Sequence, residues 1–226
     1  MLKKIIWPIE VIIITCFFGT VLQIILYIGS GSFNCLAGGF ALNVVACLTF
    51  LFYAIYRLIE FGKNNDRPFS SFFNKRILFK DIWIIFLIPF VGRVFYNLML
   101  KIEFVKIFGT SSLPQSDPLI GFQAWVMIFL IVLFIPIVAF SEELYFRCYL
   151  FQVQHERFKN YTWILNGISW SIFHLFTPTN FIAILPSCFM YSYVYQKTRN
   201  IWITIITHLL QNTIVFYPII KAYISQ

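Results

Sequence analysis

Charged residues are scarce in this chain of 226 residues: they make up 12% of it, against about a quarter in soluble domains. Acidic residues are the rarer kind, with 9 Asp and Glu against 17 Lys and Arg. Hydrophobic residues reach 60%, and the mean hydropathy is +0.80. A single fold of this size cannot hide that much apolar surface from water. The composition excludes a soluble enzyme and a disordered chain, and it indicates a polytopic membrane protein.

The common metal and redox motifs are also missing. The sequence has no C-x-x-C and no H-E-x-x-H, and the segment 155–159, His-Glu-Arg-Phe-Lys, has Lys where the second His would stand. The five cysteines lie in or beside apolar runs, which favours small buried side chains over metal or redox sites; they are Cys16, Cys35, Cys47, Cys148 and Cys188. The first apolar run lacks a small-x-small cleavage site and carries Pro8 and Glu10, so we expect a retained helix rather than a signal peptide.

The apolar runs predict an all-α fold, a polytopic transmembrane helical bundle of about seven spans, with six to eight allowed by the run lengths. Crossing a ~30 Å hydrocarbon layer takes roughly 20 residues. The runs at 161–176 and 181–196 are shorter and are separated by four residues, so they could form one hairpin that does not fully cross. The runs lie at about 5–28, 34–56, 82–100, 122–146, 161–176, 181–196 and 201–220.

The basic residues predict the orientation. Lys3 and Lys4 place the amino terminus in the cytoplasm, and strict alternation of the spans then puts 13 of the 17 Lys and Arg inside. Only Lys101, Lys106 and Lys221 fall outside. The net charge of +8 therefore indicates contact with anionic lipid, and we expect no nucleic-acid partner. The many Ile, Phe, Lys and Asn residues hint at a low-GC bacterium, so we expect an integral protein of a bacterial cell membrane.

Few ionisable residues fall within the apolar runs, and each is costly in lipid, which makes each a candidate functional residue. Glu142 and Glu143 lie near the end of the run at 122–146, directly before Leu-Tyr-Phe-Arg. Arg147 follows Glu143 at i, i+4, the favoured acid-first order for a pair on one helix face. Glu142 points about 100° away from Glu143. We therefore expect Glu143 to pair with Arg147 and Glu142 to face another element.

Two histidines and an asparagine complete the set. His174 follows a stretch with several small and polar residues, which should line the bundle interior; these are Asn166, Gly167, Ser169 and Ser171. His208 and Asn212 share a helix face at i, i+4. Each of these features alone is more often structural, and Trp170 favours packing over chemistry. Together they offer a base, a second proton carrier and hydrogen-bond donors, which water-driven amide cleavage requires.

The order of three motifs resembles the CPBP family of CAAX-protease and bacteriocin-processing membrane proteins, also called Abi proteins. The motifs are Glu142-Glu143-x-x-x-Arg147, Trp170-x-x-x-His174 and His208-x-x-x-Asn212, within about residues 120–215. Trp170 stands where the family usually has Phe, an exchange that we expect to matter little. The resemblance implies the fold of a type II CAAX prenyl endopeptidase. It divides the chain into N-terminal transmembrane helices with a basic cytoplasmic loop, residues 1–120, and a catalytic helical core, residues 121–220.

The resemblance also implies the chemistry of a glutamate-type intramembrane endopeptidase. Glu142 and His174 would activate a water, His208 and Asn212 would stabilise the oxyanion, and Glu143 and Arg147 would hold the geometry. No cofactor is expected; the alternative is a zinc enzyme with Glu142, His174 and His208 as ligands. The substrate would be a membrane-associated peptide or protein, and in a bacterium the processing of a bacteriocin or pheromone is favoured over cleavage of prenylated proteins. The sequence does not predict the oligomeric state.

Two other functions fit the same residues. The chain could be a non-enzymatic bacteriocin self-immunity or peptide-binding membrane protein. A transporter with Glu142, Glu143 and Arg93 as a proton path is less favoured, because the sequence shows no internal repeat. The peptidase hypothesis also has a geometric condition, because His174 would lie ~20 Å along a helix that begins near 161. Glu142 can meet it only if the helix before it continues to about 152, or if the later helix starts later or tilts strongly.

Overall fold

The computed structural model describes residues 7–28, 33–100, 121–175 and 178–224, and within these ranges the chain is helical with no strand. The predicted all-α fold is confirmed. The longer helices are α1 (Trp7–Ile28), α2 (Phe33–Asn64), α3 (Ile82–Leu100), α5 (Phe122–Glu143), α8 (Pro178–Thr198) and α9 (Ile201–Ile224), and the shorter ones are α6 (Phe151–Phe158) and α7 (Thr162–Phe173). Single 3-10 turns at Phe69–Phe72, Phe79–Asp81 and Lys159–Tyr161 join some of them.

Three helical stretches are long and apolar enough to cross a membrane: Ala41–Asn64, Phe122–Phe173 and Ile201–Ile224. Together with the hydrophobic composition they make the chain an integral membrane protein. The 12 residues of α7 cover only roughly 18 Å at 1.5 Å per residue, less than the hydrocarbon layer. Because α7 packs against α8, these two helices form a hairpin, one of the two arrangements that the short runs allowed.

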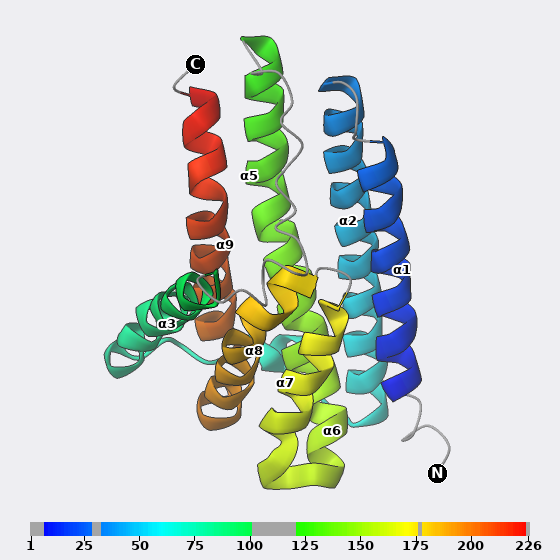
Figure 1. Ribbon diagram of the computed structural model, residues 1–226. Helices are drawn as coiled ribbons and strands as arrows, with labels where there is room; N and C mark the ends of the chain where they lie inside the picture. Colours follow the sequence, from blue (N-terminus) through cyan, green and yellow to red (C-terminus); the bar gives the residue numbers. More distant parts are fainter. Residues whose placement is uncertain (1–6, 29–32, 101–120, 176–177, 225–226) are drawn as a thin grey trace.

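Figure 1 shows α1, α2, α5 and α9 standing side by side as long rods, while α3 projects at a steep angle to them, next to α8 and α9. Helix α5 packs against α2 on one side and against α9 on the other, which places it in the middle of the bundle. The short helices α6 and α7 and the hairpin partner α8 gather in the lower half of the view, around the end of α5. Residues near the end of α5 are therefore surrounded by other helices.

Helix α5 does not stop at the two glutamates. It continues through a π-helical segment, Leu144–Leu150, into α6, so one helical path runs from 122 to 158. All seven residues of the π-helical segment are buried. A π turn is wider than an α turn and is frequently found at functional sites. The path extends past residue 152, which meets the first of the two geometric conditions for Glu142 to reach His174.

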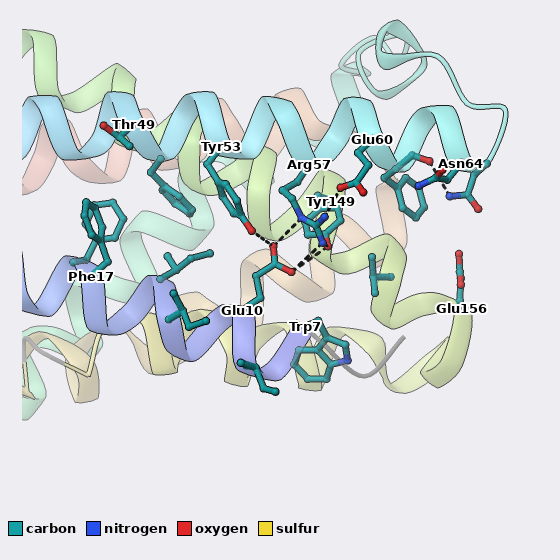
Figure 2. Close-up of a pocket in the computed structure, with 18 residues that line it drawn as sticks. Trp7, Glu10, Phe17, Thr49, Tyr53, Arg57, Glu60, Asn64, Tyr149 and Glu156 are labelled. Atoms are coloured by element: carbon teal, nitrogen blue, oxygen red, sulfur yellow. Dashed lines mark hydrogen bonds and ion pairs between the residues drawn. The ribbon is translucent and has the colours of Figure 1, made fainter. Parts of the chain in front are cut away.

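A partly buried ion pair joins α1 and α2 to the π-helical segment (Figure 2). Glu10 is only 7% exposed and accepts hydrogen bonds from Tyr53 Oη at 2.6 Å, Arg57 Nε at 3.0 Å and Tyr149 Oη at 3.2 Å. Arg57 also donates to Glu60 and to Tyr149. Because a carboxylate near the start of an apolar helix is costly unless it is paired, this cluster fixes the position of α1.

The predicted basic loop docks onto the turn between α8 and α9. Trp202 donates its indole N–H to the carbonyl of Phe73 at 3.1 Å, and Asn200 donates to the carbonyl of Arg76 at 2.9 Å. Lys75 reaches the carbonyl of Thr198 at 2.8 Å. Helix α2 itself extends to Asn64, eight residues past the predicted end at 56, so the loop is shorter than the sequence indicated.

Candidate active site

Glu142 and Glu143 lie at the end of α5, where the helix widens into the π-helical segment, and both are buried, 3% and 0% exposed. Successive residues on a helix differ by about 100° in direction. The two carboxylates accordingly face different helices: Glu142 contacts residues of α7 and the residue directly after it, and Glu143 contacts α9 and Arg147.

Glu142 meets two nitrogen atoms at one of its oxygens. Trp170 Nε1 donates to Glu142 Oε2 at 2.6 Å, and His174 Nε2 lies 3.5 Å from the same oxygen. His174 directly follows the last residue of α7, and its side chain is 25% exposed. The predicted water-activating pair is thus in contact, with the histidine at the more open edge of the site.

Glu143 bridges two other groups. Its Oε1 lies 3.1 Å from Nδ1 of His208, and its Oε2 lies 3.4 Å from Nε of Arg147. The second distance is that of an ion pair without good hydrogen-bond geometry. The expected Glu143–Arg147 pair is present, but His208 faces Glu143 at Nδ1 as well, a contact that the sequence did not predict.

Arg147 is fully buried and is held by Asn166 of α7. Asn166 Oδ1 accepts from Arg147 Nη1 at 3.1 Å and from Ser192 Oγ at 3.0 Å. Its Nδ2 donates to the carbonyl of Phe146 in the π-helical segment at 2.8 Å and to Gln154 at 3.1 Å. Asn166 therefore satisfies a backbone carbonyl of the widened turn and positions the arginine. The polar stretch before His174 predicts that Asn166 lies in the bundle interior, but it does not predict the contacts with Arg147 and Phe146.

Trp170 lies at the centre of these groups. Its ring is 4.3 Å from the guanidinium carbon of Arg147, and the ring centres of His208 and His174 are 5.5 Å and 5.7 Å away. The expectation that Trp in place of Phe matters little is therefore incomplete, because the indole adds a hydrogen bond to Glu142 that a phenyl ring could not make.

Asn212 is half-buried on α9, one turn after His208. Its neighbour Gln211 makes contacts that the sequence did not predict: its Oε1 accepts from Tyr191 Oη at 3.1 Å, and its Nε2 lies 3.5 Å from Ser187 Oγ. No spacing motif pointed to Gln211, because its partners come from α8, which carries none of the three motifs.

The alternative zinc ligands are divided between two pairs. Glu142 contacts His174, whereas the Nδ1 of His208 faces Glu143. Across the described ranges, no three His, Cys, Asp or Glu side chains are grouped so that they could hold a metal ion. As arranged here, the three predicted ligands do not form a zinc site.

A cavity of about 790 Å³ lies elsewhere, between α1, α2 and the start of α6 (Figure 2). Its wall is mostly apolar and includes the Glu10–Arg57 pair, but none of the predicted catalytic residues lines it. Phe50 in this wall stacks on Phe173 with ring centres 5.5 Å apart, and Phe173 contacts the ring of His174 at 5.1 Å. One aromatic layer therefore separates this cavity from the site.

Residues 122–214 match the family model described as "Type II CAAX prenyl endopeptidase Rce1-like". The matched range contains all three motifs, which confirms the resemblance to the CPBP and CAAX-protease family. It supports a membrane endopeptidase of the CAAX type that acts on a peptide or protein at the bilayer. No curated protein and no solved structure matches the chain.

Proposed function

We propose that this protein is a glutamate-type intramembrane endopeptidase in which Glu142 and His174 activate a water. The observation that carries the proposal is the 3.5 Å contact between the buried carboxylate and the imidazole, in a segment that matches a membrane endopeptidase family. A general base must reach its water at about 2.6–3.2 Å. In the proposed reaction the water lies beside this contact, within reach of both side chains.

The proposed reaction needs no further reactant. Glu142 takes a proton from the water while the water oxygen forms a bond to the carbonyl carbon of the substrate. The electron pair of the C=O bond moves to the carbonyl oxygen, and the resulting oxyanion is stabilised by donors from His208 and Asn212. When the oxyanion collapses, the C–N bond breaks and the proton passes to the leaving amine, either from Glu142 directly or by way of His174.

The contacts of Glu143 fit a supporting role in this scheme. A carboxylate at Nδ1 orients the imidazole and fixes which nitrogen faces it. His208 then donates Nδ1–H to Glu143, and in its protonated form it donates Nε2–H to the oxyanion. Arg147 holds the second oxygen of Glu143 and is itself held by Asn166.

We propose a membrane-associated peptide as the substrate, with bacteriocin or pheromone processing as the physiological context, and with the amino terminus of the enzyme in the cytoplasm of a bacterium. The enclosed site suits an extended peptide. A folded protein surface could not approach a carboxylate that is 3% exposed.

The test is to map new protein N-termini by mass spectrometry in membranes of cells that produce the wild-type protein or Glu142→Gln. We expect a set of cleaved peptides that appears only with the wild type, and a loss of cleavage of at least 10³-fold in the variant, the order seen when one member of a catalytic set is removed. Glu156→Gln is the matched control, because Glu156 is exposed on α6. Cleavage should also persist in a chelator.

Identical N-termini in wild-type and Glu142→Gln membranes would contradict the peptidase. If the inactive variant still protected cells against a bacteriocin, the chain would act as a binder or immunity protein. Activity that a chelator abolishes and zinc restores would overturn the glutamate-type mechanism while leaving the peptidase in place.

A further inference from the structure

The hydrogen bond from Trp170 to Glu142 is short. The indole nitrogen and Oε2 are 2.6 Å apart, and each of the two residues is 3% exposed. N–H donors usually lie 2.7–3.2 Å from an oxygen, and bonds to an ionised acceptor are the shorter and stronger ones. The contact is that of an N–H donor closely held against one oxygen of the carboxyl group.

The indole differs from the imidazole that faces the same oxygen. Trp170 and His174 are one helical turn apart, and both approach Glu142 Oε2. An imidazole nitrogen donates or accepts according to its protonation, whereas the indole N–H only donates and does not titrate. Trp170 is therefore a hydrogen-bond donor at every pH at which the protein is folded.

Packing fixes the direction of this N–H. The Arg147 guanidinium lies over the indole ring, and Tyr191 and His208 meet it edge-on at 5.2 Å and 5.5 Å between ring centres. A Phe at this position could keep such ring contacts, but it would leave Oε2 without its donor. The donor is thus a property of this chain's Trp170 rather than of the aromatic position in general.

We propose that Trp170 is a positioning residue for the catalytic base, a proposal that rests on the function proposed above: its N–H occupies Oε2 of Glu142 and so assigns Oε1 to take the proton from water. A donor to the charged form of a carboxylate favours that form. In an apolar interior an isolated carboxylate tends to take up a proton, so removal of this donor should change the pH dependence of the reaction.

The test compares pH–rate profiles for a peptide identified by the N-terminal mapping. In Trp170→Phe the acid limb of kcat/KM should move to higher pH by about one to two units, the equivalent of one hydrogen bond to a charged group. On the alkaline plateau, kcat should fall less than about tenfold and KM should stay close to the wild-type value, because Glu142 is ionised there. Trp163→Phe is the control: it lies on the same helix, where its ring packs against Phe189 and Tyr193.

Two further measurements keep the inference testable if Trp170→Phe folds poorly. Replacement of Trp170 by 3-benzothienylalanine exchanges the N–H for sulfur and keeps the ring shape, so it should shift the acid limb equally. The indole proton resonance that disappears in Trp170→Phe should move in Glu142→Gln, a readout that needs no turnover. An unchanged acid limb in both Trp170 variants, with Glu142→Gln inactive, would overturn this inference alone. Full activity of Glu142→Gln would overturn the proposed function, and an indole resonance unmoved in that variant would then overturn the hydrogen bond as well.

Discussion

Asn166 forms hydrogen bonds with four buried polar groups near the site. It contacts Arg147, Ser192 and Gln154, together with the carbonyl of Phe146, and it is fully buried. A buried donor or acceptor that loses its partner costs about 1–3 kcal/mol. One side chain thus supports the widened turn and the arginine beside the candidate base.

We expect Asn166→Ala to lower the free energy of unfolding by about 3 kcal/mol or more, because several buried groups lose a partner at once. Unfolding in mixed micelles, followed by helicity, measures the change. Asn160→Ala is the control, since Asn160 is exposed in the turn before α7. Equal stability of the two variants would show that the Asn166 contacts are dispensable.

The sequence predicts those contacts of the site that follow from the direction of a side chain on its own helix. It does not predict the contacts that depend on how separate helices pack. The separation of Glu142 and Glu143 follows from adjacent positions on a helix, so their different partners were foreseeable. The Glu143–His208 contact and the role of Asn166 depend on how α7, α8 and α9 pack, which spacing along one helix does not encode. The sequence favours a packing role for Trp170, because no spacing motif predicts that its N–H donates to Glu142.

At the scale of helices, the π-helical segment explains how residues from distant runs meet. Hydrophobic periodicity located α5, but a seven-residue π turn leaves almost no trace in an all-apolar pattern, so the sequence allowed two ways for Glu142 to reach His174. The structure has the continued helix. The extension of α2 to Asn64 was missed for a related reason, because its last turns are polar and carry the Arg57 partner of Glu10.

The attachment of α1 to the bundle can be tested through that ion pair. Glu10→Leu removes one of the two carboxylates that pair with the half-buried Arg57 and leaves it Glu60, so we expect a loss of about 1–3 kcal/mol in the free energy of unfolding. Glu10→Leu combined with Arg57→Leu should lose less than the single variant, because the arginine that Glu10 neutralises is also gone and the remaining carboxylate, Glu60, is 35% exposed. The same unfolding assay on both proteins decides; losses that simply add would show that the two charges act independently.

For the whole molecule, the helix directions predict the sides on which the chain ends lie. The first residue of α1 and the last residue of α9 are at opposite ends of the bundle in Figure 1. With the amino terminus in the cytoplasm, the carboxyl terminus should therefore lie outside.

A reporter that is active only outside the cytoplasm should be active when it is fused after Gln226. It should be inactive when it is fused after Asn74, in the basic loop, because the positive-inside rule keeps that loop in the cytoplasm. Activity at Asn74 but not at Gln226 would invert the topology, and inactivity at both positions would require an even number of crossings.

Glu10 is synthesised well before the residues that neutralise it. Its partner Arg57 is 47 residues later in the chain, and Tyr149 is 139 residues later. At about 5–20 residues per second, a ribosome delivers the arginine roughly 2–9 s after the glutamate and the tyrosine roughly 7–28 s after it. During that interval α1 carries a carboxylate that its neighbours do not yet neutralise, at a cost of order 3 kcal/mol in the membrane. Helix α1 is therefore synthesised before the residues that neutralise Glu10, and it can take its final position only after α2 has been made.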